Sequence, residues 1–170
     1  GLKTFVYFST IHVYGNFPKT LISEDSVPKP ISAYGLTHLL SENISNYYNQ
    51  TSKTNCINIR CSNSYGSPVF KESECWWLVL NDFCKTAYEK ERIIINSDGS
   101  PLRDFVHWFD ILSALELILK NSKYNIYHIA TGETLSILEL AQKVKDIYYK
   151  RYNKKISIDL PNHMNKLRKK

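Results

Sequence analysis

The sequence is poor in cysteine, and its cysteines are not arranged as metal ligands. Its 170 residues include four cysteines, none of them in a Cys-x-x-Cys pair. This spacing predicts neither a zinc site nor a disulfide framework, so we expect no metal. Because the cysteines lie in apolar segments, we expect buried free thiols. They are Cys56, Cys61, Cys75 and Cys84.

The sequence also lacks long apolar runs. No stretch approaches the roughly 18 consecutive apolar residues of a membrane span. Gly1-Leu2-Lys3 leads straight into a predicted strand and does not have the layout of a signal peptide. We therefore expect a cytoplasmic protein that does not bind a membrane.

Positive charge is in excess. The sequence has 22 Lys and Arg against 16 Asp and Glu, a net charge of +6, and 43% apolar residues. This composition is typical of one soluble globular domain. Basic residues are scattered except at 166–170 and are not interleaved with aromatic residues on one face, so we expect no nucleic-acid partner. The charge suits a polyanionic small molecule such as a nucleotide diphosphate.

The first third of the chain reads as strand, helix, strand. Residues 4–9 are β-branched and aromatic, which predicts a buried strand that delivers Ser9 and Thr10 at its carboxyl end. Ser32 is a suitable N-cap for the helix that follows. Residues 55–61 form the next predicted strand. The order predicts a parallel, right-handed βαβ unit, and ligands bind at the carboxyl edge of such sheets.

The helix after Ser32 carries a candidate acid/base pair. Tyr34 and His38 are four residues apart, so both lie on one helix face. A phenol beside a nitrogen that carries a proton can act in acid/base chemistry. For an isolated Tyr-x-x-x-His pair, two ordinary surface residues are the commoner case. The apolar residues at helical spacing are Leu36, Leu40, Ile44, Tyr47 and Tyr48.

The remainder of the chain predicts a series of shorter elements. Ile93–Ile95 and Ile156–Ile158 are short apolar strands after long helices, and we expect them to pair outside the main sheet. The expected elements are a helix over 74–90, a strand over 92–96, an extended segment over 103–107, a helix capped by Asp110, a strand over 125–130, a helix with Ser136 and Glu139 at capping-box spacing and Leu140, Val144 and Ile147 on its apolar face, and a strand over 155–160.

Five motifs occur in an order that is characteristic of one superfamily. They are Ser9-Thr10, Val13-Tyr14-Gly15, Tyr34-x-x-x-His38, Ile59-Arg60-x-x-Asn63-x-Tyr65-Gly66 and Arg103-Asp104-Phe105-Val106-His107-x-x-Asp110. With them the sequence resembles the extended short-chain dehydrogenase/reductases, and more narrowly the NAD-dependent epimerase/dehydratase family acting on nucleotide sugars. The resemblance covers nearly the whole chain. It does not cover the beginning of the family pattern, because the first strand and the Gly-rich turn that seats the dinucleotide pyrophosphate are absent.

The resemblance implies an α/β fold. It implies the C-terminal portion of a Rossmann-type doubly wound parallel sheet, with a small mixed α/β substrate-binding part. The implied division is the second half of the NAD(P)-binding domain over 1–66, a substrate-binding part over 67–100, a return to the Rossmann sheet over 101–130, and more of the substrate-binding part with a basic tail over 131–170.

The resemblance also implies catalytic roles. Tyr34 would be the acid/base that removes or returns the proton of a sugar hydroxyl while a hydride moves to or from the nicotinamide of NAD or NADP. Thr10 would hold the same oxygen. The family has a Lys where this chain has His38, and a Lys supports the phenolate and holds the nicotinamide ribose. An imidazole is mostly neutral at pH 7, so His38 either serves a working variant or marks a site that has lost its chemistry.

The remaining implied contacts flank these residues. Ser9 and Ser62, with Tyr34 and His38, would contact the cofactor, and Asn63, Arg103, Thr10 and His12 would contact the substrate. A guanidinium takes phosphate oxygens as a bidentate fork, although a salt bridge to Asp104 or Asp98 would also explain Arg103. The 4,6-dehydratases carry Asp-Glu after the Thr. This chain has Ile11-His12, which argues against that activity and leaves His12 as an extra acid/base or a structural His.

The resulting prediction is an enzyme that epimerises or oxidoreduces a nucleotide-diphosphate sugar and feeds surface polysaccharide synthesis. The alternative is a non-catalytic or vestigial Rossmann-like binding module that has lost the cofactor-binding half. The resemblance also implies a homodimer of the full-length protein, formed through the Tyr34 helix.

Overall fold

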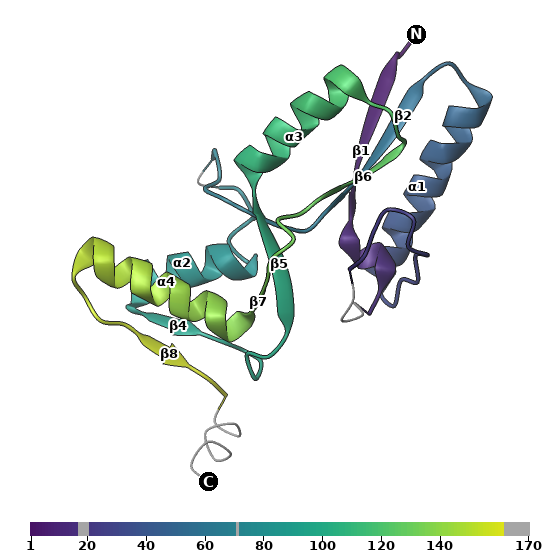
Figure 1. Cartoon of the computed structure of the whole chain (residues 1–170). Helices are drawn as coiled ribbons and strands as arrows, with labels where there is room; N and C mark the ends of the chain where they lie inside the picture. The colour runs from purple at the N-terminus through teal and green to yellow at the C-terminus, as the bar shows by residue number, and fades with distance from the viewer. Residues whose placement is uncertain (17–20, 71, 162–170) are drawn as a thin grey trace. The chain divides into compact units, whose positions relative to one another are not determined.

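A computed structural model describes residues 1–16, 21–70 and 72–161, so the basic tail lies outside the described residues. The chain divides into two compact units, one of Gly1–Ser64 and Val106–Thr131 and one of Tyr65–Phe105 and Gly132–Lys170 (Figure 1). The elements are β1 (Thr4–Thr10), the 3-10 helix η1 (Ile11–Tyr14), α1 (Ala33–Thr51), β2 (Asn55–Cys61), β3 (Asn63–Tyr65), α2 (Val79–Lys90), β4 (Arg92–Ile94), β5 (Leu102–His107), α3 (Trp108–Asn121), β6 (Ile126–Ile129), β7 (Thr134–Ser136), α4 (Ile137–Tyr152) and β8 (Ser157–Asp159).

The first unit contains a three-stranded parallel sheet in the order β1-β2-β6. Thr4 pairs with Asn55 and Thr10 pairs with Cys61, so β1 and β2 end at the same edge. The connection between these parallel strands is α1, which confirms the predicted parallel βαβ unit. The α/β fold class is confirmed as well.

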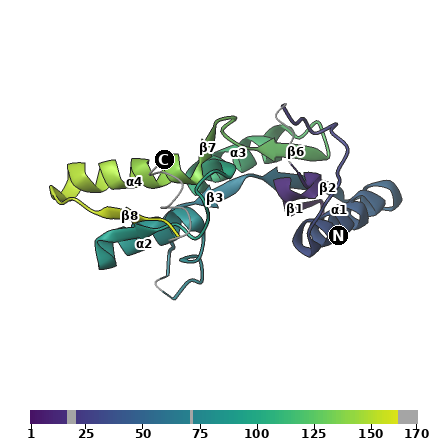
Figure 2. The ribbon, with the colours of Figure 1, turned by 90° about the horizontal axis from the view of Figure 1, so that it is seen from below.

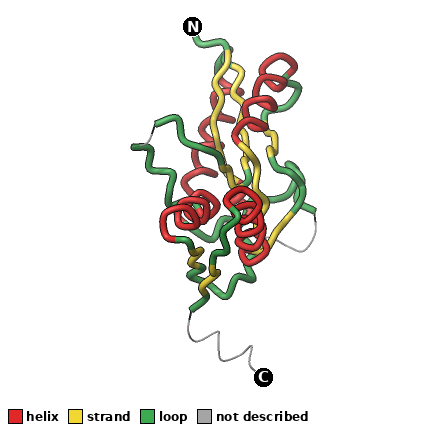
Figure 3. Tube along the Cα trace, turned by 90° about the vertical axis from the view of Figure 1, so that its left-hand side faces the viewer, coloured by secondary structure: helices red, strands yellow, loops and turns green. Residues whose placement is uncertain are grey.

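The two faces of this sheet are chemically different. Ile57 and Ile59 of β2 lie in an apolar core with Ile111 of α3. The alternate residues Asn58 and Arg60 instead hydrogen-bond to side chains of α1. The sheet therefore lies between two helices, apolar toward α3 and polar toward α1 (Figure 3).

The N-terminus of α3 corrects one prediction. The helix begins after His107, whose Nδ1 accepts a hydrogen bond from the backbone N–H of Phe109. His107 is thus the N-cap, and the predicted cap Asp110 is wrong because it already lies in the first helical turn. The apolar face of this helix packs in the core of the first unit, with Ile111, Ala114, Leu115 and Ile118.

The orientation of α1 is unusual for an amphipathic helix. Ser32 caps it as predicted, since its hydroxyl accepts from the N–H of Gly35. The residues of α1 buried in this unit are Gly35, Glu42 and Ser45. The apolar positions at helical spacing are 48–60% exposed, namely Leu36, Leu40, Ile44, Tyr47 and Tyr48. A polar face of α1 therefore contacts the sheet, and an apolar stripe faces away from it.

A buried ion pair joins α1 to β2. Arg60 Nη2 lies 2.6 Å from Glu42 Oε2, Arg60 Nε donates to both carboxylate oxygens, and the two side chains are 3% and 1% exposed. The hydroxyl of Ser9 donates to the same carboxylate. Burial acts to lower the pKa of Arg60, but the hydrogen bond and the charge of Glu42 outweigh it and raise that pKa. The charge pair is thus locked into the interface between helix and sheet.

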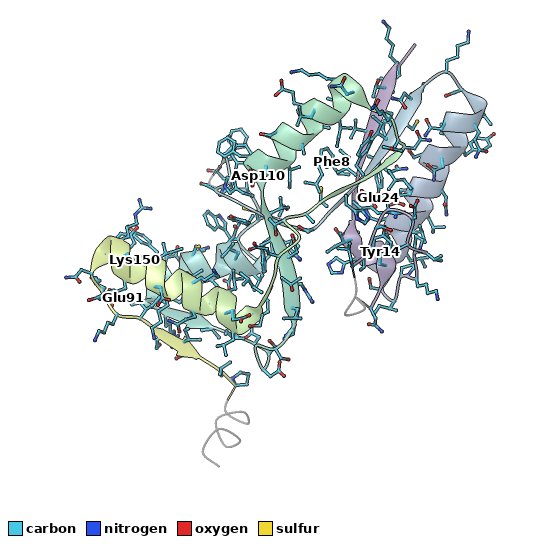
Figure 4. The ribbon with its side chains drawn as sticks, viewed as in Figure 1. Phe8, Tyr14, Glu24, Glu91, Asp110 and Lys150 are labelled. Atoms are coloured by element: carbon cyan, nitrogen blue, oxygen red, sulfur yellow. The ribbon has the colours of Figure 1, made fainter. Side chains whose placement is uncertain are left out.

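The network continues from Arg60 to the loop between η1 and α1. Tyr14 OH accepts from Arg60 Nη1 and donates to the carbonyl of Ser23, and it lies 2.6 Å from His128 Nε2. The carboxylate of Glu24 accepts from the backbone N–H of His128, and Figure 4 labels Tyr14 and Glu24 in this region. The network thus connects β1, η1, the loop, α1, β2 and β6.

The electrostatics of this network depend on burial. Burial raises the pKa of Tyr14 more than Arg60 lowers it, so the phenol stays neutral. Burial lowers the pKa of His128, and the charge of Glu24 opposes this only in part. Burial acts to raise the pKa of Glu24, but the backbone hydrogen bonds from His128 and from Glu24 itself lower it overall.

The second unit is built on a small separate sheet. β4 and β8 pair in parallel, with Ile93 opposite Ile158, so the predicted pairing is confirmed. Helices α2 and α4 pack on each other and on these strands (Figure 2). The predicted capping box of Ser136 and Glu139 is present at the start of α4. The core of this unit joins Phe83 with Leu140, Val144 and their neighbours.

Several details of the second unit differ from the predictions. Helix α2 begins at Val79 rather than at 74, because residues 74–77 form turns in which Asn81 Nδ2 holds the carbonyl of Cys75. Ile147 is 63% exposed, and Tyr148 occupies the core instead. The short strand β7 of this unit was not predicted, and neither was β3, which begins in the first unit at Asn63; with β5 they form a sheet in the order β3-β5-β7.

The cysteines are free, but they are not all buried. Cys56 is buried and Cys61 and Cys75 are half-buried, whereas Cys84 is exposed, so the prediction is wrong for that residue. None of the helices that the structure describes is long and apolar enough to cross a bilayer.

Replacing Glu42 tests the role of the buried ion pair. Glu42→Leu leaves Arg60 charged and unpaired, and should lower the free energy of unfolding by about 3–5 kcal/mol in urea titration. Glu42→Leu combined with Arg60→Met should recover most of this loss, because no buried charge remains. Glu116→Leu is the matched control, since its partner Lys120 is exposed, and it should change little. An equal loss in Glu42→Leu and Glu116→Leu would contradict this role.

Stability should fall as the pH is lowered. His128 and Glu24 both have lowered pKa values in the folded chain, so the unfolded chain binds more protons and acid favours unfolding. The contribution of His128 is complete above about pH 6.5 and is lost as the pH falls from there, and that of Glu24 is lost below about pH 4.5. The melting temperature of His128→Gln should therefore change less between pH 7.5 and 5.5 than that of wild type. Parallel curves would refute the assignment.

Candidate functional site

The candidate site lies where β1 ends and α1 begins. Thr10 is the last residue of β1 and is 5% exposed. It is also the N-cap of η1, because its hydroxyl oxygen accepts from the backbone N–H of His12 at 3.2 Å. The hydroxyl proton of Thr10 is not used in this bond and can be donated elsewhere.

A close backbone contact brings α1 to this position. A Cβ atom on Gly35 would lie 2.4 Å from the carbonyl oxygen of His12, closer than any real contact. Only glycine permits the first turn of α1 to approach η1 this closely. Tyr34, one residue earlier, is thereby brought next to His12.

Three aromatic side chains form the centre of the site. The ring of Tyr34 lies 4.6 Å from that of His38 and 5.9 Å from that of His12, both edge to face. Tyr34 itself is 56% exposed. The structure therefore brings Thr10, His12, Tyr34 and His38 together, with the phenol open to a ligand.

His38 is held by a residue that sequence reasoning missed. Nδ1 of His38 forms a hydrogen bond of 2.9 Å with the hydroxyl of Tyr7 on β1. The signal was present in the sequence, because Tyr7 lies two residues before Ser9 on the strand that ends at the site. Nε2 is the other ring nitrogen, and it can serve a ligand.

Ser9, Ser62 and Asn63 lie along the same sheet edge. Ser9 donates its hydroxyl proton to Glu42, which leaves its oxygen as an acceptor only. Ser62 follows Cys61, the partner of Thr10, and its N–H donates to the carbonyl of Ile129. Asn63 opens β3 directly afterwards.

Arg103 lies on β5, in the second unit. Its Nη1 donates to the carbonyl of Leu102 at 2.8 Å. Asp98, one of the two alternative partners, accepts hydrogen bonds from the N–H and hydroxyl of Ser100.

The site offers hydroxyl and imidazole chemistry rather than thiolate chemistry. Burial raises the pKa of Cys61 at the end of β2 to about 11, so this thiol stays protonated at neutral pH. The exposed phenol of Tyr34 and the second nitrogen of His38 are of the right type to hydrogen-bond ribose and sugar hydroxyls. The donor set thus suits a ligand that presents several hydroxyl groups, such as a ribose or a sugar.

Comparison with known proteins extends this picture. The dTDP-glucose 4,6-dehydratase of Streptomyces niveus is 26% identical over 144 residues, covering 84% of this chain and 41% of that protein. A putative UDP-glucose 4-epimerase of Methanocaldococcus jannaschii is 31% identical over 133 residues, covering 78% of this chain and 43% of that protein. The chain spans less than half the length of these curated relatives.

Solved structures are also similar to this chain. The crystal structure of the UDP-glucose 4-epimerase of Thermotoga maritima with UDP-glucose matches with a TM-score of 0.80 and 26% identity, covering 95% of this chain and 52% of that chain. The sequence model of the NAD dependent epimerase/dehydratase family matches residues 1–130, which is most of the chain. The chain therefore belongs to the NAD dependent epimerase/dehydratase family.

Proposed function

We propose that the protein carrying this chain catalyses NAD(P)-dependent epimerisation or oxidoreduction of a nucleotide-diphosphate sugar. The observation that carries the proposal is the exposed phenol of Tyr34, which lies between the rings of His12 and His38 at the carboxyl edge of the sheet. We place the reaction in the cytoplasm, where its product would supply surface polysaccharide synthesis.

Tyr34, Thr10 and His38 have separate roles in this proposal. Tyr34 takes the hydroxyl proton of the sugar alcohol as the carbon loses its hydride, and returns it in the reverse step. The hydroxyl of Thr10 would donate to the same sugar oxygen, and His38 would hold the nicotinamide ribose through Nε2–H. When bound, the nicotinamide would supply the chemistry of accepting and returning the hydride.

His12 supports epimerisation or oxidoreduction over 4,6-dehydration. The residues after Thr10 are Ile11 and His12, and neither provides the acidic pair of the 4,6-dehydratases. The rings of His12 and Tyr34 lie edge to face with their centroids 5.9 Å apart, so His12 is placed to orient the phenol.

The remaining sites follow the division of the chain. We assign residues 1–66 and 101–130 to cofactor binding, with Ser9 and Ser62 as contacts, and residues 67–100 and 131–170 to substrate binding. The two compact units support this division. Asn63 and Arg103 would hold the diphosphate or the sugar, since an amide and a guanidinium both donate to phosphate oxygens.

We also propose that the protein is a homodimer joined through α1. The support is its exposed apolar stripe, which borders an open apolar cavity of about 450 Å³ that Ile44 and Tyr48 line. In the protein carrying this chain, Leu40→Glu with Ile44→Glu should shift sedimentation from dimer toward monomer, because charges would be buried at the interface. Lys120→Glu on the exposed face of α3 is the control. A monomeric wild type would refute the proposal.

Substitutions at Tyr34 and His38 test the activity. Tyr34→Phe should lower hydride transfer, followed at the nicotinamide absorbance, by roughly 10²–10⁴-fold. His38→Lys should raise turnover at neutral to mildly alkaline pH and move the rising limb of the pH–rate profile to lower pH, because an ammonium stays charged where an imidazole does not. Tyr124→Phe removes an exposed phenol outside the site and is the control.

The outcomes separate the two functions. A wild type that turns over well while His38→Lys loses activity would show that the His has a role that the Lys analogy misses. Wild type and Tyr34→Phe that are equally silent would overturn the enzymatic proposal in favour of a binding module.

A further inference from the structure

We propose that Tyr7 is a positioning residue that keeps the proton of the neutral form of the His38 imidazole on Nε2, the ring nitrogen that Tyr7 does not contact. The inference rests on the proposed function, in which His38 donates to the nicotinamide ribose. It concerns a contact that this chain can make only because it has His at position 38, since Lys has no ring to orient.

The contact joins two firmly held elements. Tyr7 lies on β1, and its hydroxyl is 2.9 Å from Nδ1 of His38 on α1, with the two rings 5.7 Å apart and tilted by 40°. Both side chains are half-buried. Glu42, one helical turn after His38, is fixed to Arg60 and Ser9, so α1 has little freedom to move relative to β1.

The direction of this hydrogen bond decides where the imidazole proton lies. A phenol O–H is a stronger donor than the N–H of a neutral imidazole, and an imidazole nitrogen is a stronger acceptor than a phenol oxygen. Tyr7 therefore donates to Nδ1, and the single proton of the neutral ring is on Nε2. This matches the general way in which the partner of one ring nitrogen sets the role of the other.

The position of this proton matters because His38 has so few donors. An ammonium carries three N–H donors, so it can meet a ribose hydroxyl in almost any orientation. A neutral imidazole has a single N–H donor. If its proton were on Nδ1, Nε2 would offer the cofactor only an acceptor. In the described part of the chain, the hydrogen bond at Nδ1 is with Tyr7, which leaves Nε2 for the ligand.

The tautomer can be measured without cofactor. In this chain labelled with ¹⁵N-histidine, long-range ¹H–¹⁵N spectra at about pH 8, where an imidazole is neutral, should show His38 protonated on Nε2. The spectrum of His38→Gln assigns its signals. Tyr7→Phe should convert His38 to a mixture of both tautomers, whereas Tyr124→Phe should leave it unchanged. A proton on Nδ1 in wild type, or an unchanged tautomer in Tyr7→Phe, would overturn the proposal.

Kinetics of the protein carrying this chain supply the second test. Tyr7→Phe should raise the KM for the nicotinamide cofactor by about 3–10-fold, the usual worth of one hydrogen bond, with a smaller effect on kcat. In the His38→Lys background, the same substitution should change this KM by less than about twofold. Equal losses in both backgrounds would mean that Tyr7 only supports the fold, which would overturn the proposal.

The two tests keep this inference separate from the proposed function. If Tyr34→Phe abolishes hydride transfer but the tautomer of His38 is not set by Tyr7, the function stands and the positioning role fails. If the tautomer is set by Tyr7 but no hydride transfer occurs, the positioning role stands as a structural finding and the proposed activity fails.

Discussion

The buried ion pair between Glu42 and Arg60 is the interaction on which the candidate site depends. Removing two charges from water is costly, so their attraction compensates only with near-ideal geometry and extra hydrogen bonds. Arg60 Nε and Nη2, Ser9 and Tyr14 supply those bonds. Any shift of α1 on the sheet would break several of them at once. The pair therefore fixes one position of α1 on the sheet. The side chains of the site, at the N-terminal end of α1, are fixed with it.

The polar interface between α1 and the sheet also explains why the apolar residues of this helix can be exposed. If Leu36, Leu40 and Ile44 were needed to hold α1 on its own sheet, they would not be free for anything else. Because Glu42, Ser45 and the close contact at Gly35 do that work, the apolar stripe is exposed on the opposite face. The apolar stripe thus stays exposed, while the position of α1 on its sheet is fixed by charge and hydrogen bonds.

Much of the first unit could be predicted from sequence, because strands rich in β-branched residues and a capped helix have strong local signals. The capping box of Ser136 and Glu139 could be predicted for the same reason, because its signal lies within four residues of sequence. The predictions failed where tertiary contacts decide. Asp110 is a residue type that often caps helices, yet here His107 is the N-cap and accepts the hydrogen bond from the N–H of Phe109. The partners of Glu42 and His38 were missed as well, because Arg60 and Tyr7 are distant from them in sequence and the sheet register brings them to α1. For Tyr7 the one available signal was its place two residues before Ser9 on the same strand.

The spacing of Gly35, His38 and Glu42 along one helix has a consequence for sequence length. These residues follow at three and four positions, so they share one face of α1 and point at η1, Tyr7 and Arg60 in turn. Each residue of an α-helix turns the chain by roughly 100°. A single insertion or deletion between Gly35 and Glu42 would therefore rotate His38 away from Tyr7 or bury a different side chain beside Arg60. A change of length should cost more in this segment of eight residues than in a loop, because its helical register sets all three contacts.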